Sequence, residues 1–157
     1  MINQSRMKMD AEFTAVTNLV SKYFDGLYNS ETSLLAEVFH PAAHYVCATD
    51  GTVLYLTMNE YFPIVDRRPS PASRGETRND RIVSIEFAGP VTALARVECS
   101  IGTNFFTDFL TLHYLRSTKK PNYNLTLNSW IIFDRRSYIK SDTGVGIGNR
   151  MYRVHGC

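Results

Sequence analysis

The stretch SKYFDGLYNSETSLLAEVFHPAAHYV, residues Ser21–Val46, decides the fold that we predict for this chain. Apolar residues recur at every third or fourth position up to Tyr28, which is typical of the buried side of a helix. A break follows, in which Ser30 can cap a short second helix that ends just before Pro41. A strand then begins at His44. A helix pair that leads directly into a curved sheet predicts a small cone-shaped domain with a hollow interior.

The first helix is expected from about Asp10 to Tyr28, with one broad apolar stripe along it. The stripe consists of Phe13, Val16, Val20, Tyr23, Phe24 and Leu27. The second helix is expected to bury one side as well, formed by Leu34, Leu35, Val38 and Phe39.

The next segment is predicted to form a β-hairpin and a third helix. Asp50-Gly51 is a strong signal for a tight turn between strands at His44–Thr49 and Thr52–Leu56. A helix is expected soon after the second strand, and Pro63 fits it only in the first turn or with a distortion. Residues 67–77 are rich in Pro, Ser, Arg and Gly, which predicts a loop.

Longer strands follow, with the period of two that indicates a half-exposed antiparallel sheet. They are predicted at Arg81–Phe87, Val91–Ile101 and Phe105–Leu115. A polar connection, residues 117–128, leads to a last strand at Ser129–Ile139. The predicted fold class is α+β, with three N-terminal helices packed on a curved antiparallel sheet that forms a cone with an internal pocket. We expect a single domain over residues 1–140 and a Gly-rich polar tail over residues 141–157.

Charge and cysteine content argue against several classes of protein. The net charge of +2 is too small to indicate a nucleic-acid or membrane partner. No apolar run approaches the ~20 residues that span a bilayer. The N-terminus lacks the apolar stretch of a secretory signal. Cys47, Cys99 and Cys157 are odd in number and widely spaced, which predicts reduced thiols in a cytoplasmic protein.

Three segments of the chain resemble a known family. They are YFDGLYNSETSLLAEVFHPAA in the helix pair, RPSPASRGETRNDRIVSIE at Arg68–Glu86 and VECSIGTNFFTDFLTL at Val97–Leu112. Together they resemble the nuclear-transport-factor-2-like superfamily, a cystatin-like α+β cone, and within it the group named putative lumazine-binding proteins. SnoaL-like polyketide cyclases and ketosteroid isomerases are more distant relatives. The resemblance implies the fold and a homodimer but no particular activity, because this fold hosts isomerases, dehydratases, cyclases and binding proteins.

The resemblance runs roughly from Asp10 to Leu115 and leaves two later segments unexplained. The sequence RSTKKPNYNLTLNS stands where the group has a short polar hairpin, and the chain continues for more than a dozen residues beyond Lys140.

Ketosteroid isomerases use a carboxylate base, together with a tyrosine and a protonated acid that donate hydrogen bonds to the developing oxyanion. An ungapped comparison places Tyr23 at the isomerase tyrosine and Cys47 at the base. Thr111 falls at the second hydrogen-bonding acid, although a shift is possible there. The comparison retains one of the three roles and lacks the base, so it disfavours classical isomerase chemistry. Asp108 is three residues from Thr111, on the opposite face of the predicted strand.

The candidate catalytic residues are Tyr23, His40, His44 and Asp108. Tyr23 is either a core tyrosine with a bonded hydroxyl or part of a pocket floor. The histidines are either general bases or the end of a helix and the start of a strand, and Pro41 interrupts the helix face that a metal site would need, so no metal is predicted. Asp108 needs a partner if it faces inward, where its pKa can rise, and is an ordinary surface or interface acid if it faces outward.

Aromatic side chains supply stacking surfaces for a flat ligand. The candidate ligand-binding residues are Tyr23, Tyr28, Tyr55, Phe62, Thr111 and Trp130. Arg78, Asp80 and Arg81 either hold an anionic ligand at the rim or form a solvated rim. Arg96 and Glu98 share a strand face, as a solvated or dimer-facing ion pair or as a charged pocket wall.

Three hypotheses for the function result. The first is a homodimeric binding protein for a small apolar or aromatic molecule, without a cofactor. The second is a cofactor-independent isomerase, dehydratase or cyclase that uses Tyr23, His40 or His44, and Asp108. The third is a protein-interaction module that uses the sheet face. An aspartate or histidine within hydrogen-bond reach of Tyr23 across an open cavity would favour the enzyme.

Overall fold

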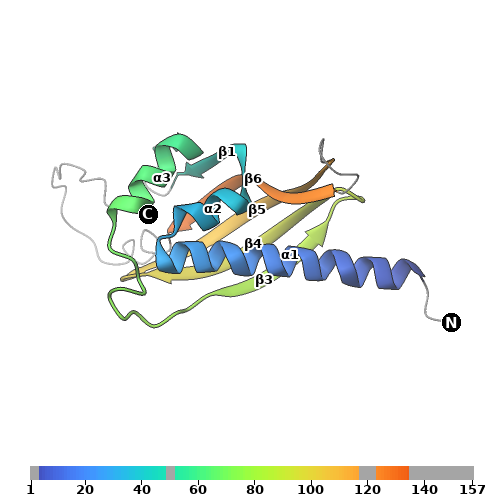
Figure 1. Cartoon of the computed structure of the whole chain (residues 1–157), viewed down its shortest axis with the longest axis horizontal. Helices are drawn as coiled ribbons and strands as arrows, with labels where there is room; N and C mark the ends of the chain where they lie inside the picture. Colours follow the sequence, from blue (N-terminus) through green and yellow to red (C-terminus); the bar gives the residue numbers. More distant parts are fainter. Residues whose placement is uncertain (1–3, 49–51, 117–122, 135–157) are drawn as a thin grey trace, which may run out of the picture.

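The computed structural model describes residues 4–48, 52–116 and 123–134 of the chain. In this part of the chain, three helices lie against a sheet of six strands (Figure 1). The elements are α1 (Gln4–Asn29), α2 (Thr32–Val38), β1 (Phe39–Cys47), β2 (Leu54–Thr57), α3 (Met58–Arg67), β3 (Arg81–Phe87), β4 (Thr92–Ile101), β5 (Asn104–Arg116) and β6 (Tyr123–Asp134). The predicted α+β fold class is confirmed.

The strands follow the order β2-β1-β6-β5-β4-β3 across the sheet. Neighbouring strands are antiparallel except for β1 and β6, which are parallel. The sheet is therefore mixed, whereas the sequence predicted a wholly antiparallel one. The reason is the route of the chain: β6 returns antiparallel along β5, and this direction is the same as that of β1 beside it.

One side of α1 forms much of the core. The residues Val16, Val20, Tyr23, Phe24 and Leu27 are buried, as the apolar stripe predicts. Phe13 is 51% exposed, against expectation. The N-terminal end of α1 projects beyond the strands (Figure 1). The helix also begins at Gln4, earlier than the predicted start at Asp10.

The two N-terminal helices meet at Gly26. A Cβ atom there would lie 2.6 Å from Cδ2 of Leu35, so a side chain would force the helices apart. Ser30 takes the left-handed conformation, with a φ of 53°, and turns the chain between the helices. The predicted cap by Ser30 is wrong: Glu31 is the N-cap, no side chain caps the helix, and Ser30 Oγ accepts a hydrogen bond from Arg68 Nε at 3.2 Å.

Two elements accommodate a proline where the sequence suggested a boundary. β1 begins at Phe39, not at His44, and runs through Pro41, because the register shifts between Phe39 and His44 where the ladder lacks a proline donor. α3 likewise contains Pro63 in its interior. Its start is fixed by Glu60, whose Oε2 accepts hydrogen bonds of 2.8 Å from both the backbone N–H and the hydroxyl of Thr57.

The three middle strands agree with prediction to within a residue at their ends. In β3 a register shift after Ile82 breaks the expected alternation and leaves Val83 exposed. β6 begins at Tyr123, so half of the predicted polar connection belongs to a strand that pairs with β5. The Asp50-Gly51 turn, the predicted strand beyond Asp134 and the tail at 141–157 lie outside the described residues.

Residues 68–80, which we call the strap, connect α3 to β3 and run across the end of α1 (Figure 1). The backbone N–H of Ala72 donates to the carbonyl of Tyr28 at 3.0 Å, and the hydroxyl of Tyr28 donates to the carbonyl of Glu76 at 2.9 Å. Glu76 Oε2 accepts a 2.7 Å bond from the N–H of Gly102 in the β4–β5 turn. Hydrogen bonds from Arg74 and then Gly102 lower the pKa of Glu76. The strap is thus fixed to α1 on one side and to the sheet on the other.

Candidate functional site

A buried pair of polar side chains joins α1 to the middle of the sheet. The hydroxyl of Tyr23 donates a hydrogen bond of 2.7 Å to Oδ2 of Asp108, on β5, and both side chains are fully buried. Burial, and then the neighbouring Asp108, raise the pKa of Tyr23 well above its ordinary value, so the phenol keeps its proton. Asp108 therefore faces inward and has Tyr23 as its partner.

Cys99 lies beside this pair. Its thiol, on β4, is 3.8 Å from Oδ2 of Asp108 and points at the same oxygen as the phenol. Burial, and then the charges of Asp108 and Asp80, raise the pKa of Cys99 well above its ordinary value, with Arg68 opposing them. The thiol is therefore protonated near neutral pH, which makes it a weak nucleophile but a hydrogen-bond donor.

The β4–β5 hairpin explains why these groups meet. Its turn joins Ile101 to Asn104, so Cys99 pairs with Phe106, and Val97 pairs with Asp108. Alternate residues of both strands then share the face that the helices cover. On β5 this places Asp108 between apolar neighbours on that face, Phe106, Leu110 and Leu112, which are all buried.

An open pocket adjoins the buried pair, at the place where β3 separates from β4. The pairing of β3 with β4 ends at Arg81 and Glu98. Preceding residues leave the sheet and cross towards α1, where Arg78 Nη1 lies 2.7 Å from Asp25 Oδ1. The separation leaves a hollow of about 340 Å³.

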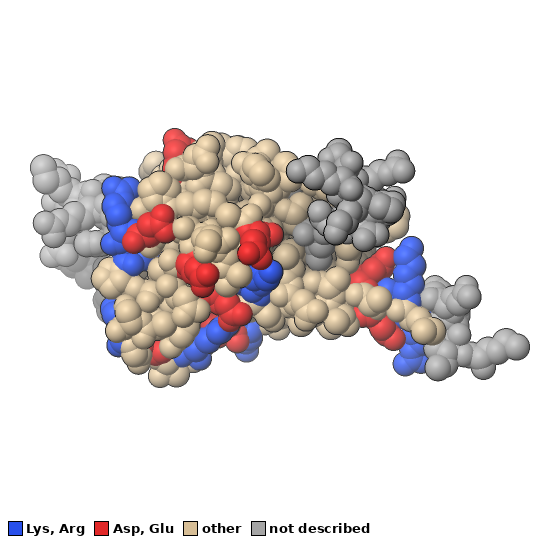
Figure 2. All heavy atoms as spheres, viewed as in Figure 1, with Lys and Arg blue, Asp and Glu red and all other residues tan. Residues whose placement is uncertain are grey.

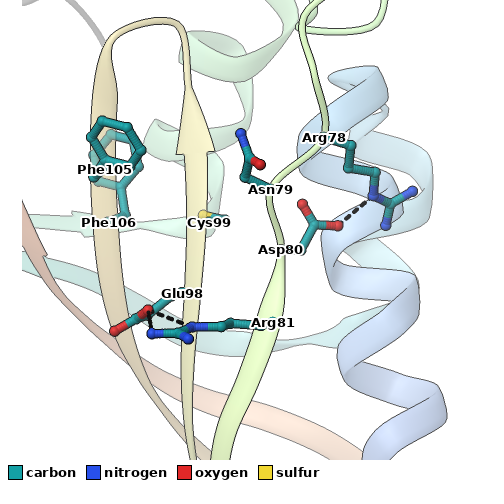
Figure 3. Close-up of a pocket in the computed structure, with 8 residues that line it drawn as sticks. All are labelled: Arg78, Asn79, Asp80, Arg81, Glu98, Cys99, Phe105 and Phe106. Carbon is teal, nitrogen blue, oxygen red and sulfur yellow. Dashed lines mark hydrogen bonds and ion pairs between the residues drawn. The ribbon is translucent and has the colours of Figure 1, made fainter.

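The pocket has mixed walls of charged, polar and aromatic side chains (Figure 3). They are Arg78, Asn79, Asp80, Arg81, Glu98, Cys99, Phe105 and Phe106. Cys99 touches both the pocket and Asp108, so a single side chain separates the hollow from the Tyr23–Asp108 pair. A bound molecule would meet aromatic carbon on one wall and hydrogen-bonding groups on the others.

The structure does not bring the two candidate histidines to this pair. His44 alternates with the buried Ala43 and Tyr45, which places it on the opposite face of β1, stacked on Tyr55 with 4.7 Å between ring centroids. Nδ1 of His40 accepts a local hydrogen bond of 3.1 Å from the backbone of Ala42.

The candidate ligand-binding residues are dispersed, and none of those whose side chains the structure describes lines this pocket. Tyr28 supports the strap and lies under Arg78, whose guanidinium carbon is 5.4 Å from the ring centroid. Tyr55 is exposed on β2, and Phe62 packs against the core. Thr111 pairs with the exposed Leu94, on the face away from Asp108.

Trp130 lies in β6, where its backbone pairs with Tyr45 and Leu110; its side chain is outside the described part.

Sequence reasoning missed half of the pocket lining. Asp80, Arg78 and Arg81 were considered as a rim and Glu98 as a pocket wall, but Asn79, Cys99, Phe105 and Phe106 were not considered as lining residues. One signal was available: a two-residue turn after Ile101 fixes the register of the hairpin and so places Cys99 next to Asp108 on the inner face.

Charges of both signs are interspersed on the face shown in Figure 2, without a continuous basic patch. Within the described residues, no group of three His, Cys, Asp or Glu side chains is arranged to hold a metal ion. None of the described helices is both long and apolar enough to cross a bilayer.

Comparison with known proteins places this geometry in a wider context. Two solved structures share the fold: an NTF-2-like protein of unknown function from Silicibacter pomeroyi (TM-score 0.65, 18% identity, 81% of this chain and 98% of that one) and an NTF2-like protein of unknown function from Shewanella baltica (TM-score 0.64, 23% identity, 79% and 94%). A ketosteroid isomerase-like protein from Erwinia carotovora atroseptica is also similar (TM-score 0.58, 6% identity, 78% and 95%). No curated protein matches.

These similarities define the chain as a protein of the nuclear-transport-factor-2-like fold. A sequence profile of the family described as "Putative lumazine-binding" matches residues 11–117. The chain belongs to this family, as the resemblance of its three segments implied.

Proposed function

We propose that the chain binds a small, flat, polar heterocycle in the pocket at the end of β3, β4 and β5. The observation that carries this proposal is the mixed lining of the hollow. Phe105 and Phe106 offer aromatic surface, while Asn79, Asp80 and Glu98 offer donors and acceptors around the same space. A volume of about 340 Å³ suits a molecule of one or two fused rings. The family description supports lumazine, a fused bicyclic dione, as the first ligand to test.

The test is a titration of the purified chain with lumazine, followed by calorimetry. Phe105→Ala removes a wall that is 54% exposed, so the fold should tolerate the change. We expect binding to weaken by about tenfold, since stacking of a base on an aromatic ring contributes ~1–3 kcal/mol.

Phe13→Ala is the matched control for this variant, because Phe13 is also about half exposed and is not among the residues that line the pocket. Its affinity should equal that of the wild type. The proposal fails if lumazine and related heterocycles do not bind, or if both variants bind with equal affinity.

The Tyr23–Asp108 hydrogen bond favours a second candidate, a cofactor-independent isomerase, dehydratase or cyclase. A carboxyl group that accepts a hydrogen bond from a phenol in a buried site is suited to transfer a proton to or from a bound carbonyl compound. The pair is sealed from the pocket by Cys99, so this candidate requires Cys99 to move aside.

A β,γ-unsaturated ketone tests this candidate, because moving a proton from its α carbon to its γ carbon produces a conjugated enone that absorbs in the ultraviolet. The wild type should catalyse the shift and Asp108→Asn should not. Equal rates for wild type, variant and buffer would reject the enzyme and leave the binding protein.

We also propose that the chain forms a homodimer through the outer face of the sheet. Leu94, on that face, is 39% exposed, although a polar residue would normally occupy such a position. Leu94→Glu should convert the dimer into a monomer in light scattering, whereas Val53→Glu, at another exposed apolar position, should not. A wild-type monomer would reject the dimer.

We propose a cytoplasmic location because Cys47 and Cys99 are buried as thiols, which is usual for cysteines in a reducing compartment. Fractionation of cells that express the full chain tests it, and recovery of the chain outside the cytoplasm would reject it.

A further inference from the structure

We infer that the pocket selects an uncharged ligand with N–H donors and rejects anionic analogues, although two arginines line it. This inference rests on the proposed binding function, because it concerns the same pocket.

The first arginine is committed to the protein itself. Arg78 forms ion pairs with Asp25, at 2.7 Å, and with Asp80, and its guanidinium lies over the ring of Tyr28. Figure 3 shows its side chain directed towards α1. The carboxylates of Asp80 and Asp25 outweigh the effect of burial and raise the pKa of Arg78, so its charge is firmly held. An anion would have to compete with two carboxylates for this group.

The second arginine is held by Glu98. Nε and Nη2 of Arg81 lie 2.7 Å and 2.6 Å from the same oxygen, Oε2 of Glu98, across the last pair of the β3–β4 ladder. The two side chains thus cancel each other's charge at the mouth of the pocket (Figure 3).

The burial of the charged side chains decides whether a ligand in the pocket meets mainly positive or mainly negative charge. The side chains of Asp80 and Glu98 are each 13% exposed, whereas those of Arg78 and Arg81 are 38% and 68% exposed. Water screens the more exposed arginines more strongly than the less exposed carboxylates. The inner pocket therefore presents acceptors, and these favour N–H groups on a ligand.

The thiol of Cys99, which lines the pocket, also indicates surroundings that disfavour negative charge. The charges of Asp108 and Asp80 add to burial in raising the pKa of Cys99, which means that the surroundings oppose a negative charge at this point. A carboxylate on a ligand would meet the same opposition.

The experiment compares two probes with the same ring system, neutral lumazine and lumazine-6-carboxylate, by calorimetry at neutral pH. The wild type should bind the neutral probe at least about tenfold more tightly, because like-charge contacts in a shielded site are costly. Asp80→Asn removes one inner carboxylate and leaves Arg78 with one acidic partner fewer. In this variant the preference for neutral lumazine over the carboxylate should become smaller or reverse.

Asp66→Asn is the matched control, since it makes the same acid-to-amide change at a surface carboxylate that accepts a hydrogen bond from Thr32. Its preference should equal that of the wild type. If the wild type binds the carboxylate as tightly as lumazine, or if Asp80→Asn and Asp66→Asn give the same ratio, the inference is wrong while the binding function stands. If neither probe binds, the binding function itself fails, and the inference with it.

Discussion

Two acidic side chains on neighbouring strands, Asp108 and Glu98, each accept a hydrogen bond of the same length but differ in their exposure to solvent. Asp108 accepts a 2.7 Å bond from Tyr23 in a fully buried site, and Glu98 accepts a 2.7 Å bond from Arg81 at the mouth of the pocket. The first pair is closed to solvent, so water cannot replace a lost partner there, whereas solvent reaches the second pair. Equal geometry therefore does not mean equal energy, and we expect the inner pair to govern stability and the outer pair to govern recognition.

The largest effect is expected from removing the inner hydroxyl. Tyr23→Phe leaves the buried carboxyl group of Asp108 without its phenol donor, and we expect a loss of about 3 kcal/mol in the free energy of unfolding, measured in urea. Tyr114→Phe is the control, because its hydroxyl forms a longer bond of 3.4 Å near the surface, to the carbonyl of Glu12. It should cost less than about 1 kcal/mol.

A double variant sharpens this result. Tyr23→Phe combined with Asp108→Val removes both partners of the hydrogen bond, and it should be more stable than Tyr23→Phe alone, since no buried carboxyl group is then left without its phenol donor. If Tyr23→Phe is no more harmful than Tyr114→Phe, burial does not distinguish the two regions.

A smaller effect is expected at alkaline pH, and only from the inner region. The pKa of Cys99 and the pKa of Tyr23 are both raised on folding, mainly by burial, above ordinary values of 9.0 and 10.0. The folded state then holds protons that the unfolded state has already released. Stability should be fully present below pH 9.0 and decline as the pH rises through and above that value.

Unfolding in urea at a series of pH values measures this decline. Cys99→Ala should remove the part of the decline that begins lowest, whereas Glu98→Gln should leave it unchanged, because a carboxyl group does not titrate there. An identical decline in Cys99→Ala would show that the thiol is not responsible.

The smallest effect on stability is expected from the outer pair. Glu98→Gln should change the free energy of unfolding by less than about 1 kcal/mol, since an ion pair with an exposed arginine contributes little. The same change should weaken the binding of lumazine several-fold, because it removes the negative charge of a carboxylate that lines the pocket. A variant that loses stability but retains affinity would reverse the roles that we assign to the two regions.

The sequence predicted the helices and strands around the Tyr23–Asp108 and Arg81–Glu98 pairs better than it predicted the pairs themselves. The apolar stripe from Val16 to Leu27 and the three middle strands depend on local periodicity, which a single sequence contains. The partner of Asp108 depends on which face of β5 turns inward, and periodicity alone left both faces open. The comparison with isomerases placed Thr111 at the position of the second hydrogen-bonding acid. In the structure Thr111 lies on the outer face of the sheet, opposite Leu94.

The pocket was hard to predict for a different reason. It exists because β3 leaves β4 at Arg81 and the strap crosses to α1, and neither event has a local signature. Its lining combines residues about 20 positions apart in the sequence. The predicted start of β1 was wrong because the sequence placed it after Pro41. A register shift in the ladder allows the strand to continue through this proline.

Hydrogen exchange at two amides that fix the strap can report whether the pocket is occupied. The amide of Ala72 is bonded to α1 and the amide of Gly102 to Glu76 of the strap, so both exchange with deuterium only when the strap lifts from its neighbours. A molecule that settles between the strap and β4 must hold these contacts closed. Slower exchange at these two amides would therefore report a ligand in crude mixtures, before its chemical identity is known.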